Sequence, residues 1–248
     1  MRIRLPALAL SFALLGAIAS WPAAAQPAPM PQVEPSLQQR TAMLKAWLQA
    51  SQAQMRAYEW IETTVVTQGG EEKSRTMKRC YYGPNGQLQK MLMQQTSAQM
   101  AEPPGILPFG RLARRVEESA KEEAKAYMQN AVELVHSYVP PNQGYFQRAI
   151  DAGQFGLQML GPTRVRLNFS NYLKQGDAYA VDVARTTNQL LGLVVNTYLD
   201  GPADPVVLNV STAVMPDGTI YNALAVLSAS AKGLQVTVQN SGFNRVAP

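Results

Sequence analysis

Cysteine and histidine are almost missing from this 248-residue sequence, which has one of each, Cys80 and His136. One cysteine cannot form an intramolecular disulfide, and a conventional zinc site needs several cysteine or histidine ligands. A serine–histidine–aspartate triad would depend on His136, which lies in a helical pattern without a supporting motif. Phosphate-binding glycine loops and the nucleophile elbow are missing too. The sequence therefore predicts no metal, no cofactor and no recognisable catalytic constellation.

Cys80 itself lies in a strand-like segment beside Lys78 and Arg79. We interpret it as a small buried hydrophobic residue. A reactive thiol, with its pKa lowered by the neighbouring cations, and an intermolecular disulfide are the alternatives. His136 is interpreted as a structural residue.

Long hydrophobic runs are also scarce. The run Leu5–Ile18 is shorter than the ~20 apolar residues that a membrane-spanning helix needs. It follows a basic start and precedes small residues at Ala23 and Ala25, which predicts a secretory signal peptide over residues 1–25. We therefore expect an exported, periplasmic protein that is soluble after cleavage near Ala25.

An excess of charge is lacking as well. The chain has 22 basic and 17 acidic residues, and two of the basic ones, Arg2 and Arg4, precede the predicted cleavage site. The mature chain would have 20 against 17, a net charge of +3. So small an excess, in an exported protein, argues against nucleic acid as a partner.

Beyond the signal peptide we expect a Pro-rich leader over residues 26–35 and one β-rich domain over 36–248. Apolar residues at helical spacing predict a helix over about 37–57. Period-two alternation then predicts three strands between Tyr58 and Met93, with a hairpin turn at Asn85-Gly86. A meander of about six strands is predicted over Pro162–Phe243.

Between the two strand blocks we expect a helical insertion over about 111–160. Its long helix would run from Arg111 to Val139, and a short apolar helix would occupy Pro141–Leu160. The fold class is therefore α+β, a curved antiparallel sheet (an incomplete β-barrel) of about nine strands with an N-terminal helix and the insertion packed on it. The Pro-rich segment before the insertion, residues 94–110, is either a lid or a packed excursion.

Two groups of residues are candidates for binding. Methionine and other flexible apolar side chains suit adaptable ligand sites as well as ordinary cores. The candidates for a ligand groove or lid are Met91, Met93, Ile106, Leu107, Phe109 and Met128. Cations at a helix start oppose the helix dipole, so they are either solvated or in contact with an anionic partner such as lipid head groups or an acidic protein. They are Arg111, Arg114 and Arg115.

The order of elements resembles the periplasmic lipoprotein-carrier (Lol-type) families. The resemblance is carried by Tyr58-Glu59-Trp60-Ile61-Glu62, the Tyr82–Gly86 hairpin and the C-terminal strands. It implies a half-open barrel whose apolar concave side, lidded by helices, holds acyl chains. The insertion 111–160 is longer than the family pattern, and none of the carriers' ligand-contacting residues is placed here.

These observations lead to three functional hypotheses. The first is an exported binding or carrier protein for a lipid or lipidated ligand in an apolar groove, and the second is a non-catalytic structural or interaction module with a protein partner in the cell envelope. The third is a hydrolase that uses carboxylates such as Glu59 and Glu62 as acid and base.

Overall fold

The structure is a computed structural model that describes residues 46, 49–97, 110–187 and 189–246, with side chains omitted for 110–121. All of these residues belong to one unit, Ser36–Pro248. The predicted signal peptide, the Pro-rich leader, most of the predicted 94–110 segment and the start of the N-terminal helix lie outside the described residues. Within the described part, residues 49–55 are helical, as the apolar spacing predicted.

Ten antiparallel strands form a single sheet in the order β3-β2-β1-β10-β9-β8-β7-β6-β5-β4. The strands are β1 (Tyr58–Gln68), β2 (Glu71–Tyr82), β3 (Leu88–Ser97), β4 (Phe155–Met159), β5 (Arg164–Ser170), β6 (Ala178–Ala184), β7 (Leu190–Tyr198), β8 (Pro205–Val214), β9 (Ile220–Ala229) and β10 (Leu234–Arg245). The other elements are α2 (Gly110–His136), α3 (Gln143–Asp151) and a 3₁₀ turn η1 (Ser230–Lys232). Strands β1 to β3 and strands β4 to β10 are therefore two consecutive meanders, and the pairing of β1 with β10 joins them into one sheet.

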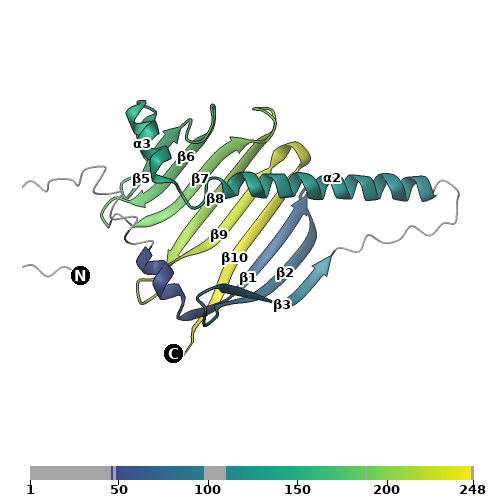
Figure 1. Ribbon diagram of the computed structural model, residues 1–248, viewed down its shortest axis with the longest axis horizontal. Coiled ribbons are helices and arrows are strands. Elements are labelled where there is room, and N and C mark those ends of the chain that lie inside the picture. The colour runs from purple at the N-terminus through teal and green to yellow at the C-terminus, as the bar shows by residue number, and fades with distance from the viewer. Residues whose placement is uncertain (1–45, 47–48, 98–109, 188, 247–248) are drawn as a thin grey trace, which may run out of the picture. The chain divides into compact units, whose positions relative to one another are not determined.

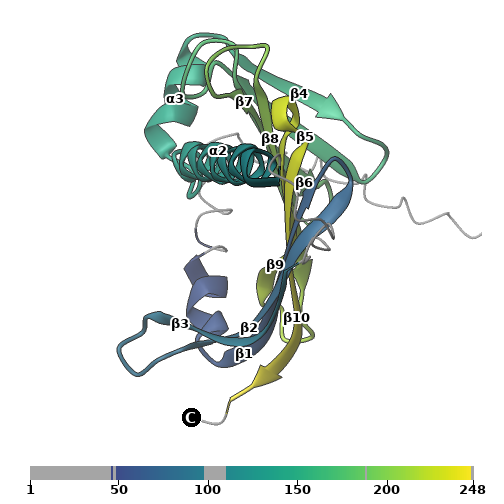
Figure 2. The same cartoon turned by 90° about the vertical axis from the view of Figure 1, so that its right-hand side faces the viewer.

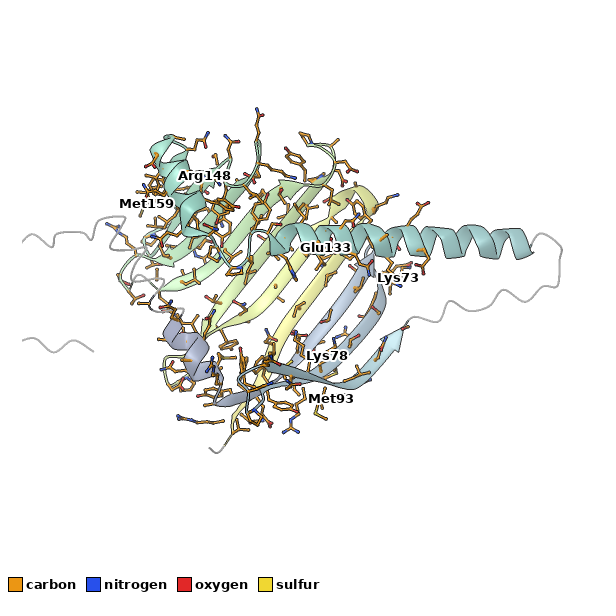
Figure 3. All side chains as sticks on the ribbon, in the orientation of Figure 1. Lys73, Lys78, Met93, Glu133, Arg148 and Met159 are labelled. Atoms are coloured by element: carbon orange, nitrogen blue, oxygen red, sulfur yellow. The ribbon has the colours of Figure 1, made fainter. Side chains whose placement is uncertain are left out.

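The sheet is open, because β3 and β4 are its edges and pair with one neighbour each. Figure 1 shows that it is also curved. Figure 2 shows that α2, α3 and the 49–55 helix lie on the same side of the sheet, which we call the inner face. Met93 on β3 and Met159 on β4 mark the two opposite edges (Figure 3). The α+β class and the incomplete barrel that the sequence predicted are confirmed.

The core lies between the helices and the inner face of β5 to β10. Alternating apolar residues on these strands face the same side because cross-strand partners share a face. Ala131 and Val135 of α2 and Ala149 of α3 are buried against them. The buried strand residues are Val165, Leu167, Phe169, Tyr179, Val183, Val195, Val206, Leu208, Leu227, Ala229 and Leu234. The protein's own helices thus occupy the face where the sequence predicted a ligand groove.

The inner face becomes polar as the sheet continues past β10. Thr64 on β1 lies between Val238 on β10 and Thr76 on β2, and Glu62 lies between Asn240 and Lys78. Directly opposite residues share a face, so these threonines and charges continue the row of core valines. The part of the inner face nearest β3 therefore mixes polar and charged side chains with a few exposed apolar ones, such as Leu92 opposite Lys78.

One segment of the predicted insertion folds differently. The sequence predicted a short apolar helix within Pro141–Leu160, but α3 ends at Asp151 and Gly153 takes a positive φ of 68°. Phe155, Leu157 and Met159 then alternate along β4, opposite Phe169, Leu167 and Val165. The helical prediction for 155–159 was wrong, because an unfilled sheet edge favours period-two alternation. The extra strand raises the count from about nine to ten.

Candidate functional site

A hollow of about 920 Å³ lies at the end of the sheet beside the β2–β3 hairpin. We call it the hairpin hollow. Its lining comes from the end of the 49–55 helix, the adjoining parts of β1, β2 and β3, the hairpin turn and the end of β10. The lining residues are Ala53, Arg56, Ala57, Glu59, Arg79, Tyr81, Tyr82, Gly83, Pro84, Met91, Arg245 and Val246. The volume falls within the ~300–1,000 Å³ usual for small-ligand sites.

Four of the lining residues point to one face of the sheet, which we call the outer face. Glu59 lies directly opposite Tyr81, and Arg79 lies directly opposite Met91. They share the face opposite to the one that carries Trp60 and Cys80. Tyr82, the residue after Tyr81, and Arg245, which is opposite Tyr58, point to the other face. The hairpin hollow therefore lies at the end of the sheet and takes strand side chains from both faces.

The apolar part of the lining is built from tyrosines, a methionine and small residues. Met91 is 53% exposed, and the hydroxyl of Tyr81 donates to its sulfur at 3.7 Å. The ring of Tyr82 packs on the buried Trp60, with 6.0 Å between the ring centroids, and Trp60 also stacks on Phe243 at 5.8 Å. This lining combines apolar surface with a flexible thioether, which suits a ligand of variable shape.

Positive charge dominates the polar part of the lining. Arg79 donates from Nε to Glu59 Oε2 at 2.9 Å, so this guanidinium and this carboxylate offset each other. Arg56 and Arg245 add two further cations, which gives three arginines against one glutamate and a net charge of +2. No ion pair between described residues includes Arg56 or Arg245. The hairpin hollow is therefore an electropositive site with an apolar wall.

Arg56 is positioned by the hairpin turn that Asn85-Gly86 forms. Gly86 has a φ of 73°, and its N–H donates to the Gly83 carbonyl at 2.8 Å. A Cβ added at Gly86 would lie 3.7 Å from Arg56 Cζ, so the guanidinium rests beside the turn. Glycine meets both requirements, a left-handed backbone and room for the arginine.

Arg245 is positioned by the pairing of the two ends of the domain. It lies opposite Tyr58 in the β1–β10 pair, and the next residue, Val246, donates its N–H to the Ala57 carbonyl at 2.8 Å. The Tyr58 hydroxyl donates to Asp217 Oδ2 at 2.6 Å, and the charge of Arg245 also acts on this carboxylate. A single acid thus stands near Arg245 without forming an ion pair with it in the described structure.

Tyr58→Phe is expected to raise the pKa of Asp217. The Tyr58 hydroxyl is the main cause that lowers this pKa to about 2, followed by the Thr219 N–H and hydroxyl. A lowered carboxyl pKa stabilises the fold above the ordinary value of 3.8, and this contribution is lost as the pH falls toward 2. An NMR titration of the Asp217 carboxyl in the variant should give a midpoint closer to 3.8. An unchanged midpoint would mean that the hydrogen bond does not form in solution.

The structure separates the predicted groove residues. Met91 lines the hairpin hollow, whereas Met93, 58% exposed on the edge strand, lies at a bulge between the β2–β3 pairs and does not line it. Met128 of α2 is partly buried against the core cluster. Ile106, Leu107 and Phe109 lie outside the described residues. Among the described candidates, only Met91 is at the hollow.

The predicted anionic-partner patch lies in the first turns of α2. Arg111, Arg114 and Arg115 belong to this helix, but their side chains are outside the described part of the structure. Figure 1 shows that the N-terminal half of α2 extends past the strands that its C-terminal half crosses. The patch stays a prediction.

The two glutamates proposed as an acid–base pair do not meet. Glu59 and Glu62 lie on opposite faces of β1, since Glu59 is opposite Tyr81 and Glu62 is opposite Lys78. Each also faces its own cation, Arg79 for Glu59 and Lys90, 2.6 Å away, for Glu62. Two carboxylates on opposite sides of a sheet cannot act on one bond, so this pair carries no hydrolytic mechanism.

The remaining candidates for chemistry have ordinary surroundings. Cys80 is fully buried and burial raises the pKa of its thiol, which confirms the interpretation as a small buried residue. His136 is exposed at the C-terminal end of α2. In the described ranges, no three histidine, cysteine or acidic side chains gather as a metal site. Likewise, none of the helices described there is long and apolar enough to cross a membrane.

Sequence reasoning missed the arginines of the hairpin hollow. Arg56 and Arg245 are 189 positions apart, and only the pairing of β1 with β10 brings them to one site. The available signal was local: Arg56 lies two residues before the first strand, and Asn85-Gly86 marks the hairpin that returns toward it. Nothing in the sequence pattern revealed that the last strand would lie beside the first.

Comparisons with known proteins gave no match to a family model and no match among curated proteins. Several solved structures are similar, and two of them are described here. A LolA superfamily protein from Nitrosomonas europaea has a TM-score of 0.32 and 6% identity, covering 83% of this chain and 94% of its own. A DUF1329 family protein from Desulfovibrio piger has a TM-score of 0.32 and 9% identity, covering 82% and 92%. The first of these two has the Lol name of the families that the order of elements resembles.

Proposed function

We propose that this protein is an exported, periplasmic binding or carrier protein for a lipid or a lipidated ligand, and that the hairpin hollow receives the acyl chain. The observation that carries the proposal is the hollow of about 920 Å³, whose apolar lining includes Tyr81, Tyr82 and Met91. An acyl chain gains roughly 0.8 kcal/mol for each CH₂ that it buries. A chain that buried eight carbons would gain about 6 kcal/mol before the cost of immobilising it.

The hairpin hollow suits an acyl chain better than the inner face does. The inner face of β5 to β10 is filled by side chains of α2 and α3, and its continuation on β1 and β2 carries threonines and charges. The hollow instead opens to solvent beside the edge strand β3, so a ligand can enter without displacing a core helix. A site of this kind fits a carrier that loads and releases its cargo.

Native mass spectrometry of the purified protein tests the proposal, together with organic extraction and lipid analysis. Copurified lipid, or saturable uptake of an added fatty acid, is the expected result. A protein that takes up no acyl ligand under any tested condition would overturn the proposal. The function as a non-catalytic envelope module would then be favoured, especially if a pull-down recovered one stoichiometric protein partner.

Met91→Glu is expected to lower acyl-chain affinity at least tenfold, because a charge in the apolar wall must lose water when the chain binds. The matched control is Met93→Glu, two residues along the same strand, with similar exposure but outside the lining. Isothermal titration calorimetry with dodecanoate measures both variants. Equal losses would place the chain along the β3 edge and not in the hairpin hollow.

A further inference from the structure

The hairpin hollow has more positive charge than an acyl chain alone would use. Arg79 is offset by Glu59, but the charges of Arg56 and Arg245 have no ion-pair partner among the described residues. Cations beside an apolar wall cost desolvation when a neutral ligand covers them, and this cost falls when the ligand brings a negative charge. The site is therefore complementary to an anionic amphiphile.

Building on the proposed function, the geometry points to an acyl amphiphile with an acidic head group, a carboxylate or a phosphate ester, as the ligand of the hairpin hollow. Its head group is held by Arg56 and Arg245, and its chain lies on Tyr81 and Met91, which share the outer face of the sheet. Guanidinium groups are suited to this task because their planar N–H donors match two oxygens of a carboxylate or phosphate.

The fold keeps both arginines in place for the head group. The hairpin turn at Gly86 packs beside Arg56, and the β1–β10 pairing with the Val246–Ala57 hydrogen bond holds Arg245. The charge of Arg245 acts on the Asp217 carboxylate, which also accepts hydrogen bonds from the Tyr58 hydroxyl and the Thr219 N–H at 2.6 Å and 3.0 Å. Because these donors already occupy Asp217, its competition with an incoming head group is reduced.

A set of three ligands separates the head group from the chain. Dodecanoate carries both parts, monododecanoylglycerol carries the same chain without charge, and acetate carries the charge without the chain. Calorimetry on the purified protein, below the critical micelle concentration, should rank dodecanoate first, the neutral ester at least tenfold weaker, and acetate without measurable binding. Raising the salt concentration should weaken dodecanoate and leave the neutral ester unchanged.

Arg56→Gln and Arg245→Gln are each expected to lower the affinity for dodecanoate about fivefold, since an exposed ion pair contributes up to about that factor. The affinity for the neutral ester should not change. The matched control is Arg185→Gln, an exposed arginine after β6 and outside the lining. The Arg56 and Arg245 Nε–Hε signals in NMR spectra should shift with dodecanoate only.

The outcomes distinguish a failure of the head-group inference from a failure of the proposed carrier function. If dodecanoate and its neutral ester bind equally, the head-group inference is overturned while the carrier function stands. If neither binds, the proposed function itself fails. Tight dodecanoate binding that is insensitive to both arginine variants would place the acid elsewhere, and acetate binding as tight as dodecanoate would mark an anion site without a chain.

Discussion

Gly192→Ala is expected to destabilise the protein by about 3 kcal/mol, the upper range for forcing extra volume into a packed interior. The added Cβ would lie 2.3 Å from the carbonyl oxygen of Val210, a distance that real Cβ atoms do not show. Because the obstructing atom belongs to the backbone of β8, no rotamer change can relieve the contact. Strands β7 and β8 would have to move apart in the middle of the sheet.

The position explains why the sheet cannot yield locally. Gly192 lies opposite Asp182 on β6 and Ser211 on β8, next to a register shift in the β6–β7 pair. A glycine at an irregular point of a strand commonly marks a close approach of two backbones. Both neighbouring pairs would lose hydrogen bonds if β7 shifted.

Urea unfolding followed by circular dichroism measures the effect, with Gly201→Ala as the matched control. A Cβ at Gly201, in the bend after β7, would have no atom within 4 Å, so this variant should stay within about 0.5 kcal/mol of the parent. Equal stabilities of the two variants would show that β7 and β8 lie further apart in solution than described.

The strands could be predicted because their signal is local. Val165, Leu167 and Phe169 alternate with polar residues, and all three are buried on the inner face. The Asn85-Gly86 turn was also predicted from chemistry, since a positive φ favours glycine. Alternation and turn residues depend on neighbours in the sequence, so the sequence shows them directly.

The site could not be predicted because it depends on distant pairings. Arg245 reaches the hairpin hollow only when β10 pairs with β1, and periodicity contains no information about which strands become neighbours. Met91 was predicted as a groove residue from its flexibility and lines the hairpin hollow, but the same argument selected Met128, which packs against the core. Chemical type alone does not separate an exposed methionine from a core methionine.

The role of Asp177, in the loop between β5 and β6, was also only partly visible in the sequence. Turns favour aspartate because its side chain accepts hydrogen bonds from the backbone, and Asp177 Oδ2 accepts the N–H groups of Leu173 and Lys174 at 3.0 and 2.9 Å. The sequence did not show that Asp177 is only 2% exposed, or that Tyr138, after α2, donates its hydroxyl to the same oxygen at 2.7 Å. Asp177 therefore joins the loop to the end of the long helix.

Asp177→Ala is expected to destabilise the protein by about 3 kcal/mol, because it removes the acceptor of three hydrogen bonds and leaves two partly buried N–H groups and the Tyr138 hydroxyl without this partner. Tyr138→Phe should cost about 1 kcal/mol, since it removes one donor and leaves the loop contacts intact. Asp200→Ala, at an exposed turn, is the control and should be neutral within about 0.5 kcal/mol. Urea unfolding gives the three values, and hydrogen exchange should show faster opening at the end of α2 in the Asp177 variant. If Asp177→Ala matched the control, the carboxylate would not fasten α2 to the sheet, and the buried position of Tyr138 would rest on apolar packing alone.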